Sequence, residues 1–458
     1  MEGLEISVVK LSEVIKSSYS SRWDSFYFQK EFLKDEKIFE TWESLENIAK
    51  IKSGTTPKER DETLKTGVVL LKTNDIRNNI LLDKGDDYFY ISEATNNEML
   101  SSQIESNDIL INIVGATTEV VGRVSFVPQN FKKANITQAM SFIRLTDSKY
   151  SPFFVFIFLQ TKYGLKQTRR IARPTGQYNI NNIELGSYKV PSVSDTFQSK
   201  IESLVKSAHA KLEESKSLYS QAEDLLLGEL GLKDWQPKNT LHTTKKFSDF
   251  AQTGRLDAEF YQPKYDDLFE RLQKVDCKTI KEIQIINYRG FQPEYVENGK
   301  IDVINSKHIL EDGLDYENFE KTDEVSFNNA VRAQVKYGDI LTYTTGANIG
   351  RTQVYLSEKK AMASNHVNML RVKDVNPIYL ALVLNSKIGR MQTEKSSTGS
   401  AQVELYPDDL ASFIIPILPE QIQTKIASLI QQSFECKAQS KQLLEDAKRM
   451  VEEEIEKN

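Results

Sequence analysis

Two long stretches of the chain place apolar residues at the spacing of an α-helix. From residue 196 to residue 230, apolar side chains return largely every three or four positions, and no proline or glycine occurs before Gly228. The same spacing runs from Pro419 to about residue 457, with the proline in the first turn, where it is tolerated. At about 1.5 Å per residue, each stretch would form a rod of about 50 Å. We expect the two stripes to pair as an antiparallel coiled coil, although each helix could instead lie along its own domain.

Shorter apolar or alternating runs, bounded by Gly, Asn and Asp, occupy much of the remaining chain. Such runs are typical of strands separated by turns. In the first half they cover residues 67–71, 108–113, 123–127 and 140–145. Apolar helical stretches interrupt them at residues 153–166 and 378–391, each entered through a proline, Pro152 or Pro377. The pattern therefore predicts an α/β (mixed α+β) fold.

The chain also repeats itself. The segment Arg22-Trp-Asp-Ser-Phe-Tyr-Phe-Gln29 returns 233 residues later as Arg255-Leu-Asp-Ala-Glu-Phe-Tyr-Gln262. Asp108-Ile-Leu110 is matched by Asp339-Ile-Leu341, and each stands seven residues before a Gly-Ala pair. Further on the offset becomes 225 and stays there, as at Gln177 and Gln402. Two units of roughly 230 residues therefore share a framework and differ in the segments between framework positions.

A linker rich in Gly, Pro, Asn, His and Thr, residues 231–245, marks the boundary between the units. The predicted divisions are a first globular domain over 1–195, a first long helix over 196–232, the linker with a second globular domain over 233–418, and a second long helix over 419–458. This order predicts two domains in a pseudo-twofold repeat, separated by the two long helices. An old duplication whose halves now only pack on each other is the alternative, but the divergence is concentrated between matched turn residues.

Length, charge and cysteine content narrow the class of protein. With 458 residues, the chain exceeds the about 250 to 300 residues at which single cores stop growing. A net charge of −6 argues against a protein that coats nucleic acid by bulk attraction, so any DNA contacts should lie in restricted patches. The sequence has no apolar run of about 18 residues, no signal-peptide pattern at its start, and only two cysteines, Cys277 and Cys436. These features predict a cytoplasmic protein without a disulfide framework and without a membrane partner.

Sequence-directed DNA methylation is the nearest enzymatic alternative. Asn376-Pro-Ile-Tyr379 and Ser151-Pro-Phe-Phe154 superficially resemble the Asn-Pro-Pro-Tyr loop of adenine methyltransferases, but both lack the second proline and stand at a predicted helix start. The sequence contains no glycine-rich turn for S-adenosylmethionine or a dinucleotide, no phosphate-binding loop, and only four scattered histidines. Pro407-Asp-Asp409 lacks the Glu-x-Lys partner of a nuclease site. We therefore expect no catalytic residues, no bound metal and no cofactor in this chain.

The duplicated features together resemble the specificity (S) subunit of Type I restriction-modification systems, over nearly the whole chain. They are the turn Gly54-Thr-Thr-Pro57, the strands from Asn107 to Gly115 and from Gly338 to Gly346, the Thr-Gly stretches before Gln177 and Gln402, the strand ends at Pro191 and Pro416, and the long helices. Two departures are visible. Asn107 stands where the second copy has Gly338, so the two turns are expected to differ. The first helix ends in the segment 228–235, whereas the second has no such segment, which predicts unequal helix ends.

The resemblance implies two target-recognition domains, each reading one half of a split double-stranded DNA sequence. It also implies that the long helices bind two adenine-methyltransferase (M) subunits and that restriction (R) subunits join to cleave. S-adenosylmethionine, ATP and Mg would then belong to those partners. A duplicated structural scaffold, or an S-like protein that serves another complex, stays open as the alternative.

Candidate DNA contacts are polar and basic residues of the variable turns, because Arg and Lys pair with guanine or phosphate and Gln or Asn with adenine. In the first unit they are Lys52, Thr55, Thr56, Lys58, Lys72, Asn74, Arg77, Thr117, Arg123, Arg170, Arg173, Gln177 and Tyr178. In the second unit they are Tyr288, Arg289, Gln292, Lys307, His308, Thr344, Asn348, Arg351, Asn365, His366 and Gln402. For any single one of them, the plainer interpretation is a solvated side chain or a turn former. Candidate partner-binding residues on the helices are Ile201, Val205, Leu212, Leu218, Ile426, Leu429, Ile430 and Leu443.

Two domains with different variable segments should read an asymmetric target with a fixed, non-specific gap. Each domain reaches only a few base pairs, so we expect half-sites of about three to five base pairs and a gap of similar or slightly greater length. Replacing Leu429 and Ile430 by Asp is expected to abolish assembly with the methyltransferase while the recognition domains stay folded.

Overall fold

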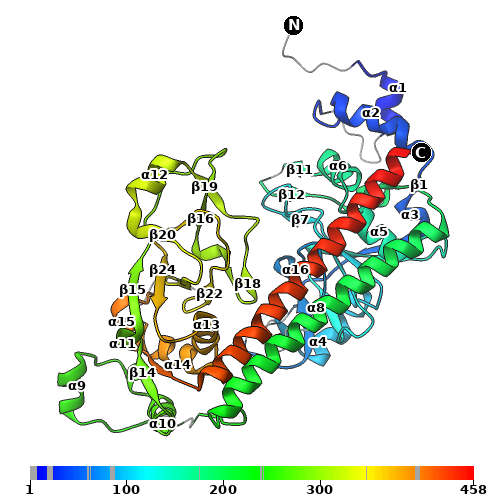
Figure 1. The fold of residues 1–458 in the computed structure, drawn as a ribbon. Coiled ribbons are helices and arrows are strands. Elements are labelled where there is room, and N and C mark those ends of the chain that lie inside the picture. The colour runs from blue at the N-terminus through cyan, green and yellow to red at the C-terminus, as the bar shows by residue number, and fades with distance from the viewer. Residues whose placement is uncertain are drawn as a thin grey trace. The chain divides into compact units, whose positions relative to one another are not determined.

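The computed structural model describes residues 8–17, 24–58, 61, 63–82, 88–174, 176–237, 240, 242–346, 348–397 and 403–457. Arg22, Trp23, Thr175 and Gln402, which belong to the repeated segments, lie outside the described residues. The chain divides into two compact units, Met1–Glu213 with Ala438–Asn458 and Glu214–Lys437. Helices α8 (Asp195–Glu229) and α16 (Glu420–Lys457) each contribute residues to both units (Figure 1). Among the described residues, no helix combines the length and apolar composition that a membrane crossing requires.

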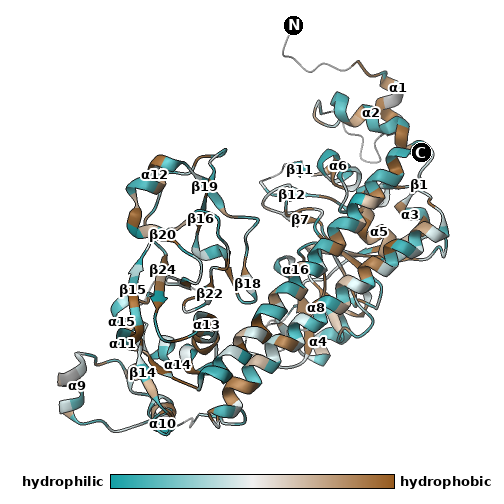
Figure 2. Ribbon diagram, viewed as in Figure 1, coloured by the Kyte–Doolittle hydropathy of each residue, from teal (hydrophilic) through white to brown (hydrophobic). Residues whose placement is uncertain are grey.

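Helices α8 and α16 pack against each other in antiparallel orientation, which confirms the predicted helix pair (Figure 1). In the first unit, Ser440 Oγ donates to the carbonyl oxygen of Ala208 at 2.6 Å. In the second unit, Ser433 Oγ donates to the carbonyl oxygen of Ser215 at 2.8 Å. Ser215 follows Ala208 by seven residues along α8, and its partner Ser433 precedes Ser440 by seven residues along α16, so the two helices run in opposite directions. Apolar positions recur along both helices (Figure 2) and enter the hydrophobic core of each unit.

The first unit is built around a mixed sheet with strand order β2-β10-β6-β8-β4. Its strands are β2 (Ala49–Ser53), β4 (Asn79–Ile80), β6 (Ile109–Asn112), β8 (Val124–Phe126) and β10 (Met140–Leu145). Neighbouring strands are antiparallel except β4 and β8, and Phe142 of β10 stands between Lys52 and Leu110. Strand β6 is buried along its whole length. The runs predicted at 67–71, 108–113, 123–127 and 140–145 are therefore confirmed as strands.

Smaller sheets and short helices complete the first unit. The sheets have the orders β5-β3-β9, β11-β12-β7 and β1-β13. Their strands are β1 (Glu43–Ser44), β3 (Val68–Leu71), β5 (Tyr90–Ile91), β7 (Val114–Gly115), β9 (Ala134–Ile136), β11 (Arg173–Pro174), β12 (Tyr178–Asn179) and β13 (Lys189–Val190). The helices are α1 (Leu11–Ser17), α2 (Lys30–Phe39), α3 (Leu45–Ile48), α4 (Glu93–Glu98), α5 (Pro152–Phe158), α6 (Lys162–Ile171) and α7 (Asn182–Gly186), with 3-10 turns η1 (Thr73–Asp75) and η3 (Leu100–Ser102). Apolar α5 covers the central sheet, since the Phe153 ring stacks on Phe126 of β8 with centroids 4.6 Å apart.

The second unit repeats this plan. Its central sheet has the order β15-β24-β21-β22 with antiparallel neighbours, and a second sheet has the order β19-β16-β23-β20. The strands are β14 (Cys277–Thr279), β15 (Gln284–Arg289), β16 (Ile301–Ile304), β17 (Ile309–Leu310), β18 (Gly313–Leu314), β19 (Glu320–Thr322), β20 (Gln334–Val335), β21 (Ile340–Tyr343), β22 (Thr352–Val354), β23 (Ala361–Ala363), β24 (Val367–Val372) and β25 (Ile414–Pro416). The helices are α9 (Phe247–Thr253), α10 (Pro263–Leu272), α11 (Ile280–Ile283), α12 (Glu324–Asn329), α13 (Pro377–Asn385), α14 (Lys387–Ser396) and α15 (Pro407–Ala411), with 3-10 turns η4 (Ala258–Tyr261), η5 (Ser306–His308) and η6 (Val331–Ala333). The parallel pair β16 and β23 matches β3 and β9 of the first unit, and the mixed α+β fold is confirmed in both units.

Each predicted apolar helix after Pro152 and Pro377 is divided in two. The stretch 153–166 falls on α5 and α6, and the stretch 378–391 falls on α13 and α14. Hydroxyl side chains mark the breaks. Thr161 Oγ1 donates to the Phe158 carbonyl at 2.6 Å, and Ser386 Oγ donates to the Val383 carbonyl at 2.7 Å. Such local bonds compete with the helical backbone, and both residues then cap the helix that follows.

The turn before β6 and the turn before β21 are alike, contrary to the difference expected from Asn107 and Gly338. Asn107 has φ 68° and Gly338 has φ 85°, so both occupy the left-handed region. Their amides make equivalent bonds in the two units: Asn107 N donates to the carbonyl of Val127 and Gly338 N donates to that of Tyr355, each at 2.8 Å. Asparagine is among the few residues that adopt this conformation without glycine's freedom. After α8, Trp235 is buried and donates from Nε1 to Asp267 at 3.1 Å.

Candidate nucleic-acid interface

A buried ion pair holds the same place in both units. At the start of β6 and of β21, Asp108 and Asp339 have fully buried carboxylates. Arg144 of β10 donates to Asp108 through Nε and Nη2, both at 2.7 Å, and Arg371 of β24 donates to Asp339 at 2.6 and 2.7 Å. These bonds raise the pKa of each guanidinium. Two parallel bonds fix geometry as well as charge, so each pair fastens one end of the central strands.

The opposite ends of the same strands carry most of the second unit's candidate residues. We define the second loop edge as residues 289–293, 344–346, 348–351, 364–366 and 403–406. Backbone bonds join these segments: Gly290 N to Val367 O at 3.0 Å, Thr344 N to His366 O at 3.3 Å, and Gly346 N to Val403 O at 3.0 Å. The structure thereby brings together Arg289, Gln292, Thr344, Asn348, Arg351, Asn365 and His366, with Tyr288 directly before them on β15.

The first unit has the corresponding loop edge. We define the first loop edge as residues 52–57, 113–123, 136–139 and 176–180. Gly54 N donates to Met140 O at 2.9 Å and Ile113 N to Ala139 O at 3.0 Å, while Tyr178 of β12 pairs with Gly115 of β7. The structure thereby brings together Lys52, Thr55, Thr56, Thr117, Arg123, Gln177 and Tyr178.

A further candidate loop of the first unit, residues 72–79, adjoins the first loop edge. Asn112 Nδ2, at the end of β6, donates to the carbonyl of Thr73 at 3.1 Å, and Val124 N donates to Asn78 Oδ1 at 3.0 Å. This loop carries Lys72, Asn74 and Arg77, which are exposed. The Lys72 ammonium lies 3.8 Å from the centroid of the Phe89 ring.

One glycine in each unit makes the loop edge possible. A Cβ atom on Gly54 would lie 2.3 Å from the carbonyl oxygen of Ile136, and one on Gly290 would lie 2.1 Å from that of Ala363. No side chain fits at either position. The turns 54–57 and 290–293 therefore press directly on the backbone that precedes β10 and β24.

Several predicted contact residues instead hold the protein together. Arg170 donates from Nε to the Tyr27 carbonyl at 3.0 Å and pairs with Glu36 at 2.5 Å, which fastens α2 to α6. Arg173 pairs with the buried carboxylate of Glu184. Arg289 donates to the Leu405 carbonyl at 3.0 Å. Their guanidinium groups are therefore engaged within the protein.

His308 and Thr344 are also engaged internally. His308 is buried, and its Nδ1 accepts from the Asn305 amide at 3.0 Å while Nε2 lies 3.0 Å from the Glu320 carboxylate. Burial lowers the pKa of this imidazole. Thr344 is buried and donates to the His366 carbonyl at 2.9 Å. Exposed ion pairs occupy two lysines as well, Lys58 with Glu98 at 3.2 Å and Lys307 with Glu320.

Residue type alone missed part of both loop edges. Phe291, Tyr406 and Val403 are exposed apolar side chains of the second loop edge, and Gln138 is exposed at the first. Polar and basic residues were the only types expected at a DNA contact, which explains why Phe291 and Val403 were missed but not why the polar Gln138 was. The matched turns Gly54-Thr-Thr-Pro57 and Gly290-Phe-Gln-Pro293 carry the signal that points to Phe291. The candidate Gln402 lies outside the described residues, next to Val403.

The candidate partner-binding residues of the helices fall into two sets. Ile201, Val205, Ile426 and Ile430 are buried in the hydrophobic cores of their units. Leu212, Leu218, Leu429 and Leu443 are half-buried. Only the second set leaves apolar surface that a partner helix could contact.

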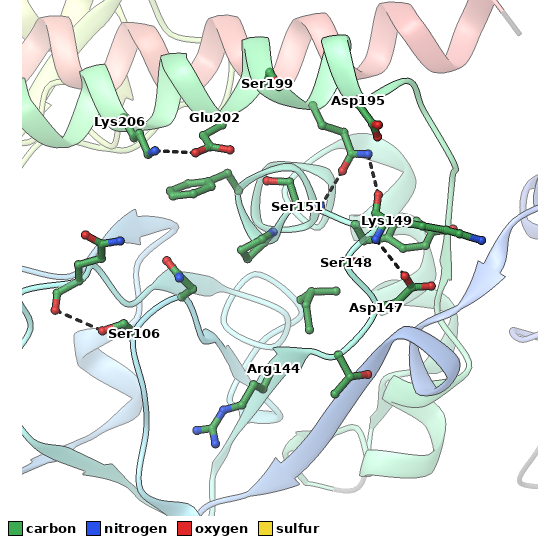
Figure 3. Close-up of a pocket in the computed structure, with 18 of the residues that line it drawn as sticks. Ser106, Arg144, Asp147, Ser148, Lys149, Ser151, Asp195, Ser199, Glu202 and Lys206 are labelled. Atoms are coloured by element: carbon green, nitrogen blue, oxygen red, sulfur yellow. Dashed lines mark hydrogen bonds and ion pairs between the residues drawn. The ribbon is translucent and has the colours of Figure 1, made fainter.

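A polar cavity of about 700 Å³ lies in the first unit, beside the Arg144 end of the strands (Figure 3). It is lined by residues 144–153 and by the first turns of α8. Gln198 of α8 accepts from the Ser151 amide at 2.6 Å and donates to the Lys149 carbonyl at 2.8 Å. In the second unit Gln423 accepts from the Asn376 amide at 3.0 Å in the same way. The cavity is therefore framed by structural bonds and is separate from the first loop edge.

Across the described part of the chain, no group of three or more His, Cys, Asp or Glu side chains is arranged to hold a metal ion. The loop edges instead present hydroxyl, amide, guanidinium and aromatic groups on rigid turns. Such groups recognise base edges and phosphates by hydrogen bonds and apolar contact.

Residues 273–449 match the family described as Type I restriction modification DNA specificity domain. No curated protein matches the chain. Among solved structures, the chain is similar to the Type-I restriction-modification system S subunit from M. genitalium, with 14% identity over 91% of this chain and 94% of that one and a TM-score of 0.37. It is also similar to the HsdS subunit from Thermoanaerobacter tengcongensis, with 14% identity over 90% of this chain and 95% of that one and a TM-score of 0.28.

Proposed function

Since residues 273–449 match the family described as Type I restriction modification DNA specificity domain, we propose that the whole chain is the DNA-recognition subunit of a Type I restriction-modification system. The observation that carries the proposal is that the first unit repeats the bonds of the matched domain. The buried pairs Asp108–Arg144 and Asp339–Arg371 are one instance. A first unit that shares this framework is a second domain of the same kind.

A two-bond glutamine clamp is the other instance. Gln167 of α6 accepts from the Lys189 amide at 2.6 Å and donates to the Lys189 carbonyl at 3.0 Å. Gln392 of α14, 225 residues later, accepts from the Ile414 amide at 2.7 Å and donates to the Ile414 carbonyl at 3.0 Å. Both clamps tie a helix to the strand that precedes α8 or α16. The shared framework therefore extends from the central sheets to the long helices.

The two loop edges differ while their frameworks agree, which supports a bipartite and asymmetric target. Each loop edge would read one half-site, and a non-specific gap would separate the half-sites. Groups for base reading differ between the edges: Thr55 and Ala139 in the first unit occupy the places of Phe291 and His366 in the second. Two different half-sites follow.

The partners we propose are double-stranded DNA, two adenine-methyltransferase subunits and restriction subunits, in the cytoplasm. The half-buried leucines Leu212, Leu218, Leu429 and Leu443 would provide the methyltransferase contact. S-adenosylmethionine, ATP and Mg would be bound by the partners, and this chain would direct their chemistry without taking part in it.

Co-expression with a Type I methyltransferase subunit tests the proposal, with N6-methyladenine mapped across the host genome. We expect methylation at a split, asymmetric motif that appears only when both chains are present. Methylation by this chain alone, or a continuous or palindromic motif, would contradict the proposal.

A further inference from the structure

The turn 290–293 presents an exposed aromatic ring at the second loop edge. The Phe291 side chain is 60% exposed. Its amide donates to the Ala363 carbonyl at 3.0 Å, and Gly290 N donates to Val367 O at the same distance. Pro293 is buried. The turn is therefore fastened by its backbone, and the ring projects from a rigid support.

The ring stands among groups that suit base recognition. Gln292, Asn365 and His366 are exposed, and the bonds of Gly290 and Phe291 to residues 363 and 367 bring the last two beside the turn. Single exposed phenylalanines are common on protein surfaces and need no explanation. A phenylalanine held on a rigid turn among amide and imidazole groups is a different case, because the polar groups fix what its ring meets.

The first unit carries a different side chain on the same turn. The Thr55 amide donates to the Ile136 carbonyl at 3.1 Å, which matches the bond of the Phe291 amide. Thr55 is half-buried, and its Oγ1 accepts from Ser102 Oγ at 3.2 Å. Its side chain is thus engaged with its own domain, whereas Phe291 projects from the turn. The two turns therefore have matching backbone bonds but expose different side chains.

We propose that Phe291 reads a thymine of the second half-site through its C5 methyl group; this rests on the proposed function. A phenyl ring neither donates nor accepts a conventional hydrogen bond, so it cannot satisfy the major-groove edges of adenine, guanine or cytosine. Thymine presents the only methyl group there, at C5. Gln292, next along the turn, would meet the adjoining base pair. The second half-site therefore contains a T·A pair that Phe291 specifies, and Thr55 gives the first half-site no such contact.

The test uses the chain in complex with its methyltransferase and duplexes that carry the mapped target. Each thymine of the second half-site is replaced singly by deoxyuridine, which lacks only the C5 methyl group. At one position the wild-type complex is expected to lose about fourfold in affinity, equivalent to the about 0.8 kcal/mol of one buried methyl group. The F291S variant, whose short polar side chain carries no methyl group, is expected to bind the two duplexes equally.

The matched control is V325T, since Val325 is 66% exposed in the same unit but lies on α12, outside the second loop edge. It should keep the deoxyuridine sensitivity of the wild type. F291S with unchanged sensitivity, a second half-site without a T·A pair, or loss of the methyltransferase from F291S would each overturn the assignment of Phe291. A wild-type complex that shows no sequence preference would instead overturn the proposed function, and this inference with it.

Discussion

The two ends of the central strands differ in how much of their side-chain chemistry the two units share. At one end, Asp108 with Arg144 and Asp339 with Arg371 form the same two bonds in both units, with donor–acceptor distances of 2.6 to 2.7 Å. At the other end, the same strands lead into loop edges that share backbone bonds but not side chains. A framework fixed at one end lets residues at the other end change without disturbing the fold. The proposed DNA recognition can therefore diverge between units whose cores stay alike.

Two neighbouring residues of α16 are expected to show the largest difference between a core position and a partner-binding position. Ile430 is 4% exposed in the core of the second unit, so I430D buries an unpaired charge and is expected to destabilise that unit by several kcal/mol, about 4 or more. Leu429 is half-buried, so L429D is expected to leave the fold intact and to remove the methyltransferase. Denaturation and co-purification of the single variants measure the two effects. The sequence analysis expects the double substitution of Leu429 and Ile430 by Asp to leave the recognition domains folded, but the burial of Ile430 makes that expectation wrong. The two positions are therefore tested separately. Equal unfolding midpoints for L429D and I430D would contradict the assignment of Ile430 to the core and of Leu429 to the partner surface.

Removal of a framework carboxylate should come next in size. D339A leaves the Arg371 guanidinium, 27% exposed, and the Lys336 amide without their acceptor. We expect a loss of about 3 kcal/mol in the free energy of unfolding of the second unit, and a similar loss in the first unit for D108A. The control is E311A, which removes the exposed pair Glu311–Arg390 and should change stability by less than about 1 kcal/mol. Equal effects of D339A and E311A would show that the buried pair is not part of the framework.

The glycines beneath the loop edges test whether the two edges work separately. G290A forces a methyl group against the Ala363 carbonyl and is expected to cost about 1 to 3 kcal/mol of stability. It should weaken recognition of the second half-site only, and G54A that of the first only. G228A is the control, because a Cβ on Gly228 meets nothing within 4 Å and alanine favours a helix. The idea fails if G290A changes methylation at both half-sites equally.

The smallest expected effect is a pH dependence of stability that only the second unit shows, because it carries His308 where the first unit carries Asp75. His308 and Asp75 occupy matched positions, and each side chain accepts from the amide three residues earlier. Burial lowers the pKa of His308, which faces Glu320, Lys307 and Asp315, so the folded unit favours the neutral imidazole. Stability from this residue is therefore present above the unfolded pKa of about 6.5 and is lost as pH falls.

Hydrogen exchange of second-unit amides at pH 7.5 and 5.5 measures that loss. H308N keeps an acceptor for the Asn305 amide and is expected to flatten the dependence, while first-unit amides serve as the internal reference. A wild-type second unit that is more protected at pH 5.5 than at 7.5 would reverse the sign and refute the assignment.

The sequence predicted the architecture because the architecture is repetitive. Matched positions such as Asp108 and Asp339 recur in the same order in both units, and the apolar spacing of the long helices needs no distant partner to be recognised. The undivided helices at 153–166 and 378–391 were wrong, since Thr161 and Ser386 use local hydroxyl bonds that apolar spacing does not show. The difference expected between Asn107 and Gly338 was wrong because asparagine tolerates the same backbone.

The candidate site was harder to predict, since residue type does not reveal a distant partner. Arg77 is exposed, but Arg170 is held by a carbonyl 143 residues away and Arg289 by one 116 residues away. Nothing near these arginines in the sequence distinguishes a structural role from a contact. Phe291 was missed for the opposite reason, because an apolar residue was not considered as a reader of DNA.

Exchange of one unit's variable region tests most directly the claim that one framework carries two independent readers. Residues 40–190 would be replaced by the corresponding residues of a relative with a different target, and N6-methyladenine would be mapped in cells that also express the methyltransferase. We predict that one half-site changes to that of the relative while the other half-site and the gap stay the same. A chimera that alters both half-sites, or neither, while still methylating DNA would contradict the account.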